Sequence, residues 1–296
     1  MMNRRRFLAV SAAALGAPAT AQPTEWRGHA MGAEVSLTFD ANPEAAASAI
    51  TKVQALLDRA ESLFSLYRPD SDLVRLNQTG ILVNPAPEML ELLSICDWAH
   101  GRTGGRFDPT VQPLWLAAAN GRNLDAAREL IGWDRVRISE DRIVLGQGQQ
   151  LTMNGIAQGF VTDLVANTLR NAGWTNVLVN IGEYYAAGRI WRLGVSDPVH
   201  GIVQTVRLRD RAIATSSPSV LRLSPVHLHI LNAKNERPAL WSTVSVEAAN
   251  AAMADALSTA LCHVPASEIA DILSLSKGNP KAICTHESGE VSIFYS

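Results

Sequence analysis

Hydrophobic residues recur at three- and four-residue spacing along several parts of this chain, which is the pattern of helices with one buried face. The longest run begins after Asn42-Pro43-Glu44, where Asn is a favourable N-cap and Pro a favourable first helical residue, and it continues to Phe64. A second run begins near Pro87, and a third, over 156–172, stops at Gly173, a residue type favoured just beyond helix ends. Shorter helices are expected over 124–130, 248–263 and 267–275.

Strand-like segments are short and lie mostly in the second half of the chain. Between Trp191 and Val246 the chain reads mainly as strands, in the segments WRLGV, IVQTVRL, AIAT, VHLHIL and STVSV. Helices and strands do not alternate in a regular β-α-β order, so the pattern predicts an α+β fold with largely antiparallel sheets and packed helices. Further strands are expected over 35–39, 136–138, 143–145 and 176–181, with a hairpin over 283–295 and irregular loops over 67–80 and 101–115.

The first residues are typical of an export signal. Arginines at residues 4–6 precede Phe7-Leu8 and a short Ala-rich segment, and Ala19-Thr20-Ala21 matches a cleavage signal. We interpret residues 1–21 as a twin-arginine signal peptide and 22–296 as one domain, which predicts export to the periplasm by the twin-arginine machinery. The alternative is a chance basic start on a cytosolic protein. Removal of residues 1–21 removes three arginines and no acidic residue, so the net charge changes from −2 to −5.

Composition narrows the choice of function. The chain is 47% hydrophobic and 18% charged, which suits a globular protein, and it has no basic patch with interleaved aromatic residues, which argues against nucleic acid as a partner. It also lacks the P-loop, dinucleotide-binding, nucleophile-elbow and zincin motifs. Cys96, Cys262 and Cys284 have no metal-binding spacing; buried free thiols are favoured, with one Cys96–Cys262 or Cys262–Cys284 bridge as the alternative.

The segment 252–262, AMADALSTALC, combines a hydrophobic helical pattern with polar side chains on one face. Asp255 and Thr259 are four residues apart and Asp255 and Ser258 three apart, so all three share a helix face. A hard cation such as Mg²⁺ prefers oxygen ligands and takes few carboxylates together with substrate phosphates. The segment therefore indicates part of a magnesium site, or else a buried Asp satisfied by local hydroxyl groups.

Three other segments carry weaker signals. The glycines of LTMNGIAQGFVTDLV (151–165) leave backbone groups open to a metal or a diphosphate, or else mark a helix start capped by Asn154. In TGGRFDPTVQPLW (103–115), Phe107 is placed to stack on a flat ligand and Asp108 to hydrogen-bond it, unless the loop is purely structural. His227 and His229 are two apart on an expected strand, where a two-His metal site competes with a structural role.

Several motifs occur together and in order, and their combination resembles the ApbE family of FAD:protein FMN transferases over about residues 31–264. The segment 103–115 is similar to the family's T-G-G-A-F-D-P-T-V-x-P-L-W almost residue for residue. The motifs are Ala30-Met31-Gly32, ESLFSLYRPDSDLVRLN (61–77), TGGRFDPTVQPLW (103–115), NGIAQGFVTD (154–163), AIATSS (212–217), HILNAKNERPA (229–239) and MADALSTAL (253–261).

The resemblance implies an ApbE-like fold with a flavin cleft and a Mg²⁺-dependent phosphoryl transfer. FMN would pass from FAD to a Thr or Ser hydroxyl of a target flavoprotein, and AMP would leave. Asp255 or His229 would assist deprotonation of the incoming hydroxyl. The implied metal ligands are Asp255, Thr259, the nearby Ser258 and the carbonyl of Ala157. The implied flavin or adenosine contacts are Met31, Tyr67, Arg106, Phe107, Asp108, Asn154, Gln158, Phe160, His229 and Ile230.

The chain departs from the family pattern at four places. Gln158 stands where the family has Lys, which removes a positive charge near phosphate. Ile181-Gly182-Glu183 replaces Gly-Gly-Glu, Ser217 replaces a Gly, and 232–236 replaces an Asp-Pro-x-Thr-Gly turn. The form of these motifs is most similar to the NosX-type branch, which implies a membrane-associated acceptor such as the regulator NosR.

Three other functions remain open at this point. An FAD-binding accessory protein with weak or no transfer is favoured by Gln158 and by the altered turn. A Mg²⁺-dependent FAD pyrophosphatase would release AMP and FMN to water without an acceptor. A non-catalytic structural domain is the third. The motifs around Asp255 and Phe107 favour the transferase over the accessory protein, and the ordered set of motifs disfavours a purely structural domain. An acceptor with a flavinylatable Thr separates the transferase from the pyrophosphatase.

Overall fold

The computed structural model describes residues 13–14, 24–41 and 43–296. Most of the expected signal peptide, and Asn42 as the expected N-cap, lie outside these residues. Within them the protein is an α+β fold built on an eight-stranded sheet in the order β14-β13-β12-β11-β8-β7-β3-β2, with every neighbouring pair antiparallel. A smaller sheet has the order β1-β9-β10 and another the order β4-β6-β5.

The strands of the main sheet are β2 (Thr24–Ala30), β3 (Ala33–Phe39), β7 (Val177–Asn180), β8 (Tyr184–Ala187), β11 (Arg211–Ser216), β12 (Thr243–Ala248), β13 (Lys281–Thr285) and β14 (Val291–Tyr295). The smaller sheets contain β1 (Ala13–Ala14), β9 (Trp191–Asp197) and β10 (Gly201–Leu208), and β4 (Ile81–Val83), β5 (Arg137–Ile138) and β6 (Arg142–Val144). The helices are α1 (Pro43–Phe64), α2 (Asp72–Thr79), α3 (Pro87–Arg102), α4 (Gln112–Asn120), α5 (Leu124–Arg128), α6 (Ala157–Asn171), α7 (Ala251–Leu261) and α8 (Ala266–Ser274), with short 3₁₀ turns η2 (Pro109–Val111), η3 (Trp133–Arg135) and η4 (Pro218–Val220).

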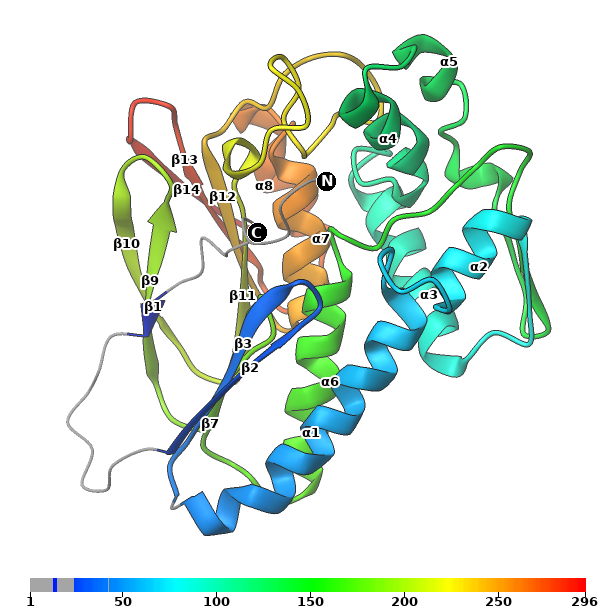
Figure 1. The fold of residues 1–296 in the computed structure, drawn as a ribbon. Helices are drawn as coiled ribbons and strands as arrows, with labels where there is room; N and C mark the ends of the chain where they lie inside the picture. Colours follow the sequence, from blue (N-terminus) through cyan, green and yellow to red (C-terminus); the bar gives the residue numbers. More distant parts are fainter. Residues whose placement is uncertain (1–12, 15–23, 42) are drawn as a thin grey trace.

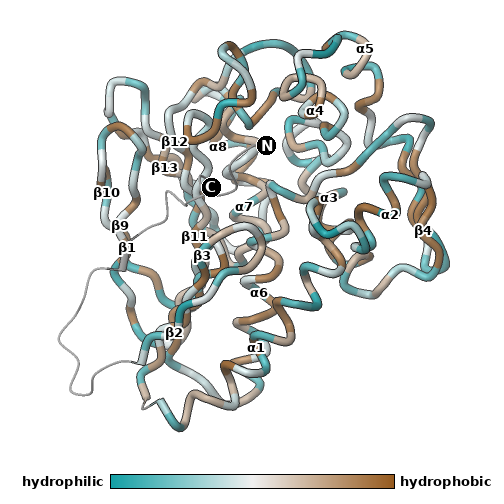
Figure 2. The backbone as a smooth tube through the Cα atoms, viewed as in Figure 1, coloured by the Kyte–Doolittle hydropathy of each residue, from teal (hydrophilic) through white to brown (hydrophobic). Residues whose placement is uncertain are grey.

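The helices α1, α6 and α7 cover one face of the main sheet, and the hairpin of β9 and β10 covers the other (Figure 1). Hydrophobic and hydrophilic positions alternate along α1, as its helical periodicity predicts (Figure 2). The largest core lies between α1, α6 and strands β3 and β7, where Val53, Phe160 and Leu37 are almost fully buried. Among the described residues no helix is both long enough and apolar enough to span a bilayer.

Most predicted elements are confirmed, including the helices that became α1, α3, α5, α6, α7 and α8. The expected loop over 67–80 is wrong, because it contains α2. The Ser71 hydroxyl accepts a hydrogen bond from Val74 N at the start of α2, and Gly80 ends it in the left-handed conformation. The segment 101–115 is likewise not irregular throughout, since α3 extends to Arg102 and η2 leads directly into α4.

The expected strand VHLHIL is absent. Within 217–242, a segment drawn in yellow that extends from the sheet towards α4 and α5 (Figure 1), the regular structure is η4 and one isolated bridge between Arg222 and Leu228. Proline at 218, 225 and 238 removes backbone donors that a strand ladder would need. The three cysteines are buried and unbridged, so neither alternative disulfide forms.

Candidate functional site

A cleft lies where β11 ends, beside the turn between β7 and β8 and the first turn of α6. One part of its lining, the first wall, comes from α6 and α7, and a second wall comes from residues 106–115 together with the segment 217–242. Its polar lining residues are Arg106, Asp108, Thr152, Asn154, Gln158, Glu183, Thr215, Ser216, Ser217, His229, Asp255 and Thr259.

The helices α6 and α7 are packed closely because Gly159 has no side chain. A Cβ atom at Gly159 would lie 2.3 Å from the carbonyl oxygen of Ala251. The carboxylate of Asp163, on the next turn of α6, accepts hydrogen bonds from Ala251 N at 2.8 Å and Ala252 N at 2.9 Å. These bonds satisfy backbone donors at the start of α7 and fix it against α6, and so position Asp255.

Asp255 and Glu183 are two buried carboxyl groups in the cleft. Asp255 Oδ2 accepts a hydrogen bond from Gly159 N at 3.0 Å, and Glu183 Oε2 accepts one from Thr215 N at 3.0 Å. Burial raises the pKa of Asp255 to about 7. Burial, followed by the nearby Asp255 charge, raises the pKa of Glu183 well above its ordinary value. No ion pair between described residues involves either carboxyl group.

Hydroxyl groups of α7 and β11 lie beside this carboxyl pair. Ser258 Oγ donates to the carbonyl oxygen of Asp255 at 3.0 Å, so it accepts from Ser216 Oγ, 2.9 Å away. Thr259 Oγ1 lies 3.3 Å from Ser216 Oγ and lines the cleft. Ser258 is fully buried and its hydroxyl supports Ser216. Ala157, whose carbonyl oxygen is a predicted metal ligand, is buried in the first turn of α6.

This donor set fits a hard divalent cation. Burial raises the pKa values of both carboxyl groups and no ion pair neutralises them, so a bound cation would stabilise their ionised forms. All the side-chain donors are oxygens, and Mg²⁺ takes one or two carboxylates plus phosphate oxygens. The described residues contain no group of three or more His, Cys, Asp or Glu side chains placed to hold a metal, as a closed protein site would need. The two-His alternative is not supported, because His227 Nδ1 lies 2.9 Å from Ser224 Oγ and the expected strand is absent.

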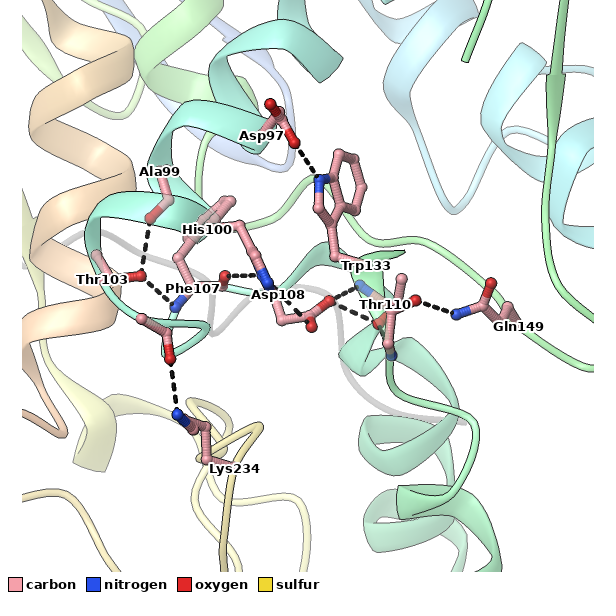
Figure 3. Close-up of polar contacts among 12 residues, drawn as sticks. Asp97, Ala99, His100, Thr103, Phe107, Asp108, Thr110, Trp133, Gln149 and Lys234 are labelled. Carbon is pink, nitrogen blue, oxygen red and sulfur yellow. Dashed lines mark hydrogen bonds and ion pairs between the residues drawn. The ribbon is translucent and has the colours of Figure 1, made fainter. Parts of the chain in front are cut away.

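The loop 103–110 is held by an internal network (Figure 3). Asp108 Oδ1 accepts from Thr110 N at 2.8 Å and from Thr110 Oγ1 at 2.5 Å, and Phe107 N donates to Thr103 Oγ1 at 3.0 Å. His100 Nδ1 lies 3.0 Å from the carbonyl oxygen of Phe107. Phe107 and Asp108 line the cleft but are largely buried. They therefore stabilise the loop, whether or not they also contact a ligand.

His229 lies in the second wall, and carbonyl groups fix the orientation of its ring. His229 Nδ1 is 3.0 Å from the carbonyl oxygen of Pro218 and 3.2 Å from that of Leu221. Carbonyl oxygens only accept, so Nδ1 carries the proton and the lone pair of the neutral ring is on Nε2. Burial lowers the pKa of His229, which favours this neutral form near pH 7.

The structure brings most of the predicted site residues together in the cleft. The predicted cleft residues found in its lining are Arg106, Phe107, Asp108, Asn154, Gln158, His229, Ile230, Asp255 and Thr259. Met31 is adjacent, since its carbonyl oxygen accepts from Gln158 Nε2 at 3.2 Å.

Two predicted ligand contacts lie elsewhere. The prediction for Phe160 is corrected, because its ring is 2% exposed in the core and packs edge-on against Phe64. Tyr67 is 55% exposed after the end of α1 and is not among the cleft residues. Glu183 is a site residue that the sequence did not assign. The Gly-Glu pair after an expected strand is the one local feature that marks its position.

The fold and the cleft define an α+β protein with an acidic, oxygen-lined site that suits a divalent cation and a phosphate-bearing ligand. Residues 31–284 match the ApbE family, and the chain belongs to that family. This confirms the resemblance drawn from the motifs around Asp255 and Phe107.

Individual relatives agree with this assignment. The FAD:protein FMN transferase of Chlamydia trachomatis is 26% identical and aligns with 83% of this chain and 84% of its own length. The protein of the same name from Vibrio cholerae is 26% identical over 68% of each chain. The solved structure of the flavin transferase ApbE from Vibrio cholerae has a TM-score of 0.78 at 22% identity, covering 93% of this chain and 98% of that one. The apo flavinyl transferase ApbE of Pseudomonas stutzeri has a TM-score of 0.77 at 24% identity, covering 93% and 94%. These structures confirm the fold.

Proposed function

We propose that this chain is an FAD:protein FMN transferase that requires Mg²⁺. The observation that carries the proposal is the pair of buried carboxyl groups, Asp255 and Glu183, in an oxygen-lined cleft of an ApbE-family protein. Transfer from FAD needs a site where the negative charges of a diphosphate and of nearby carboxylates are both neutralised. A divalent cation held by Asp255, Glu183 and Thr259 meets this need.

The reaction that this site supports is a phosphoryl-type transfer. A Thr or Ser hydroxyl oxygen of the acceptor forms a bond to the phosphorus on the FMN side of FAD. The bond from that phosphorus to the bridging oxygen breaks, and AMP leaves with the bridging oxygen. When bound, Mg²⁺ supplies neutralisation of the charge that develops on the phosphate oxygens.

His229 is the favoured base for the incoming hydroxyl. Its Nε2 lone pair accepts the proton, and the resulting imidazolium keeps its Nδ1–H directed at the carbonyl groups of Pro218 and Leu221. Asp255 serves as a metal ligand in this scheme, although its raised pKa makes it the second candidate base. Gln158 donates to the Met31 carbonyl, and so positions the loop before β3 without adding positive charge.

The N-terminal sequence supports a place of action for this transferase, and with it a class of acceptor. The arginines at residues 4–6 and the cleavage signal ending at Ala21 support export to the periplasm. The acceptor is then an exported or membrane-associated flavoprotein with an exposed Thr or Ser, and a NosR-like protein matches the branch that the motifs resemble.

An FAD-binding accessory function is the second candidate, and Gln158 is the observation that favours it. The amide at residue 158 makes a hydrogen bond to the Met31 backbone and offers no charge to a phosphate. A protein that binds FAD without transferring FMN would fit this feature.

The test is transfer itself. The purified protein is incubated with FAD, Mg²⁺ and an acceptor domain with a flavinylatable Thr, and flavin fluorescence on the acceptor is recorded after denaturing electrophoresis. We expect a fluorescent acceptor with the native protein and none with Asp255→Ala or without Mg²⁺. Retained FAD with no labelled acceptor would support the accessory function. AMP release without an acceptor would indicate the pyrophosphatase.

A further inference from the structure

Beside the cleft, a chain of hydrogen bonds connects the β9–β10 hairpin to the turn that holds His229. Asp197, the last residue of β9, is 2% exposed, and its carboxylate accepts four hydrogen bonds. Two come from the backbone of Val199 and His200, at 2.8 and 3.0 Å, and close the turn to β10. The other two come from Ser242 Oγ at 2.6 Å and Thr243 Oγ1 at 2.7 Å.

The donor and the acceptor can be assigned for each side-chain hydrogen bond between Ser217, Thr243 and Asp197. Burial acts to raise the pKa of Asp197, but the hydrogen bonds from Ser242, Thr243 and the backbone outweigh it, so the pKa lies below its ordinary value. An ionised carboxylate only accepts, so the single hydroxyl proton of Thr243 is donated to Asp197. Ser217 Oγ lies 2.8 Å from Thr243 Oγ1 and must therefore donate to it.

The register of the sheet brings these hydroxyl groups together. Ser216 of β11 pairs with Val244 of β12, and one further step in the same register places Ser217 beside Thr243. Ser217 is the N-cap residue of η4, yet its side chain makes no capping hydrogen bond to the turn. Its hydroxyl is instead directed across to β12, which ties the start of η4 to the sheet.

The 3₁₀ turn η4 orients the ring of His229 through two carbonyl groups. The carbonyl groups of Pro218 and Leu221, at the two ends of the turn, are those that face His229 Nδ1, and Leu221 also accepts from His229 N at 3.0 Å. Any shift of η4 relative to β12 would move both carbonyl acceptors together.

We propose that Asp197, Thr243 and Ser217 form a positioning relay that fixes the orientation and tautomer of His229. The inference rests on the proposed function for the catalytic use of His229, but the relay itself is a structural property. It also gives a role to Ser217, a departure from the family motif noted in the sequence, because a glycine there has no hydroxyl to reach Thr243. Such support of a catalytic group commonly decides whether a site is held tightly enough to act.

The deciding variant is Thr243→Val, which keeps the side-chain shape and removes both hydroxyl bonds. Ser217→Ala breaks the same relay at its other end, and Thr243→Ser restores the hydroxyl. The matched control is Ser245→Ala. Ser245 Oγ makes the same kind of cross-strand contact, 2.8 Å from Thr215 Oγ1, two residues further along the same strand pair, but has no link to η4.

Two measurements separate positioning from general stability. The first is imidazole NMR of protein labelled with ¹⁵N-histidine, in which His229→Gln identifies the His229 signals among the seven histidines. We expect the Nδ1–H tautomer of His229 in the native protein, Ser245→Ala and Thr243→Ser, and a mixture of tautomers in Thr243→Val and Ser217→Ala. The second is transfer kinetics, in which Thr243→Val lowers kcat by about tenfold while the dissociation constant for FAD stays within about twofold.

Each outcome decides the proposal. A native tautomer and a native kcat in Thr243→Val would overturn it, as would equal losses in Thr243→Val and Ser245→Ala. If Thr243→Val does not fold, Ser217→Ala decides by the same criteria. A native protein that shows no transfer refutes the proposed function, and the NMR result then still supports or overturns the relay.

Discussion

The two walls of the cleft are held in place by different means. On one side, α6 and α7 are buried, closely packed through Gly159, and joined by Asp163 and Asp255, which accept backbone hydrogen bonds across the helix pair. On the other side, the segment 217–242 has little regular structure and is tied to its neighbours by a few side-chain contacts. One of these is partly exposed, from Arg128 Nη1 to the carbonyl oxygen of Asn232 at 3.0 Å.

This difference suits the chemistry that each wall carries. Buried carboxyl groups near a metal need fixed partners, because an unpaired charge in a mobile buried site is strongly destabilising. Under the proposed function the other wall must admit an acceptor chain, and surface contacts there can open at small cost in free energy. His229 belongs to the looser wall, but it lies near the end of this segment that is attached to the sheet by the hydrogen bond between Ser217 and Thr243.

The largest loss of stability is expected at Gly159, where the rigid wall has no space for a side chain. Gly159→Ala would place a Cβ atom 2.3 Å from the Ala251 carbonyl oxygen and 2.7 Å from the Cβ of Asp255, so α6 and α7 must separate. We expect a loss of about 3 kcal/mol in the free energy of unfolding, measured by urea denaturation. Gly101→Ala is the control, because no atom lies within 4 Å of its added Cβ near the end of α3. Equal stabilities of the two variants would contradict close packing as the basis of this wall.

The carboxyl pair predicts a pH dependence of the same wall. The pKa of Asp255 is raised to about 7, so its contribution to the stability of the metal-free protein is full below the ordinary value near 4 and is lost as the pH rises through 7. Metal binding requires both carboxyl groups to be deprotonated, so the Mg²⁺ association constant should fall by at least about tenfold for each pH unit below 7. Titration calorimetry with Mg²⁺ at pH 6, 7 and 8 measures this.

Glu183→Gln sharpens that measurement. Glutamine at this position removes one of the two protons that metal binding must displace, so the fall in affinity below pH 7 should become shallower, although binding is weaker overall. An affinity for Mg²⁺ that is constant between pH 6 and pH 7 in the native protein would show that the pair is not the metal site.

The sequence predicted the rigid wall better than the loose one. The periodicity of α7 placed Asp255 and Thr259 on one face. This feature is local, so spacing along the chain is enough to find it. The glycines of 154–163 were expected to leave backbone groups open to a metal or a diphosphate, whereas in the structure Gly159 allows α6 and α7 to pack closely. Glu183 was not assigned, because its place beside Asp255 depends on the pairing of β8 with β11, which a single sequence does not reveal.

Three errors have different physical causes. The helix α2 is defined by its caps at Ser71 and Gly80 and buries only two residues, Leu73 and Leu76, so its hydrophobic signal is weak. In 217–242 the alternation of hydrophobic and polar residues in VHLHIL is typical of a strand. In the structure His229 instead contacts the carbonyl groups of Pro218 and Leu221, and no strand ladder forms there. Phe160 matched a ligand position by motif, whereas the burial of its helix face assigns it to the core.

The smallest change in stability is expected at Lys234, on the surface of the loose wall. Lys234 Nζ donates to the Gly104 carbonyl oxygen at 2.8 Å, an exposed contact that joins the segment to the loop 103–110 (Figure 3). Lys234→Ala should leave the free energy of unfolding within about 0.5 kcal/mol of the native value, because exposed charged contacts contribute little to global stability. It should nevertheless increase amide hydrogen exchange in residues 230–240 by up to about tenfold, with no change in α7, since local opening loses one hydrogen bond. Lys52→Ala, on the exposed side of α1, controls for loss of charge. Exchange that rises equally in α7 and in 230–240 would mean that the two walls open as one unit, and would remove the distinction between them.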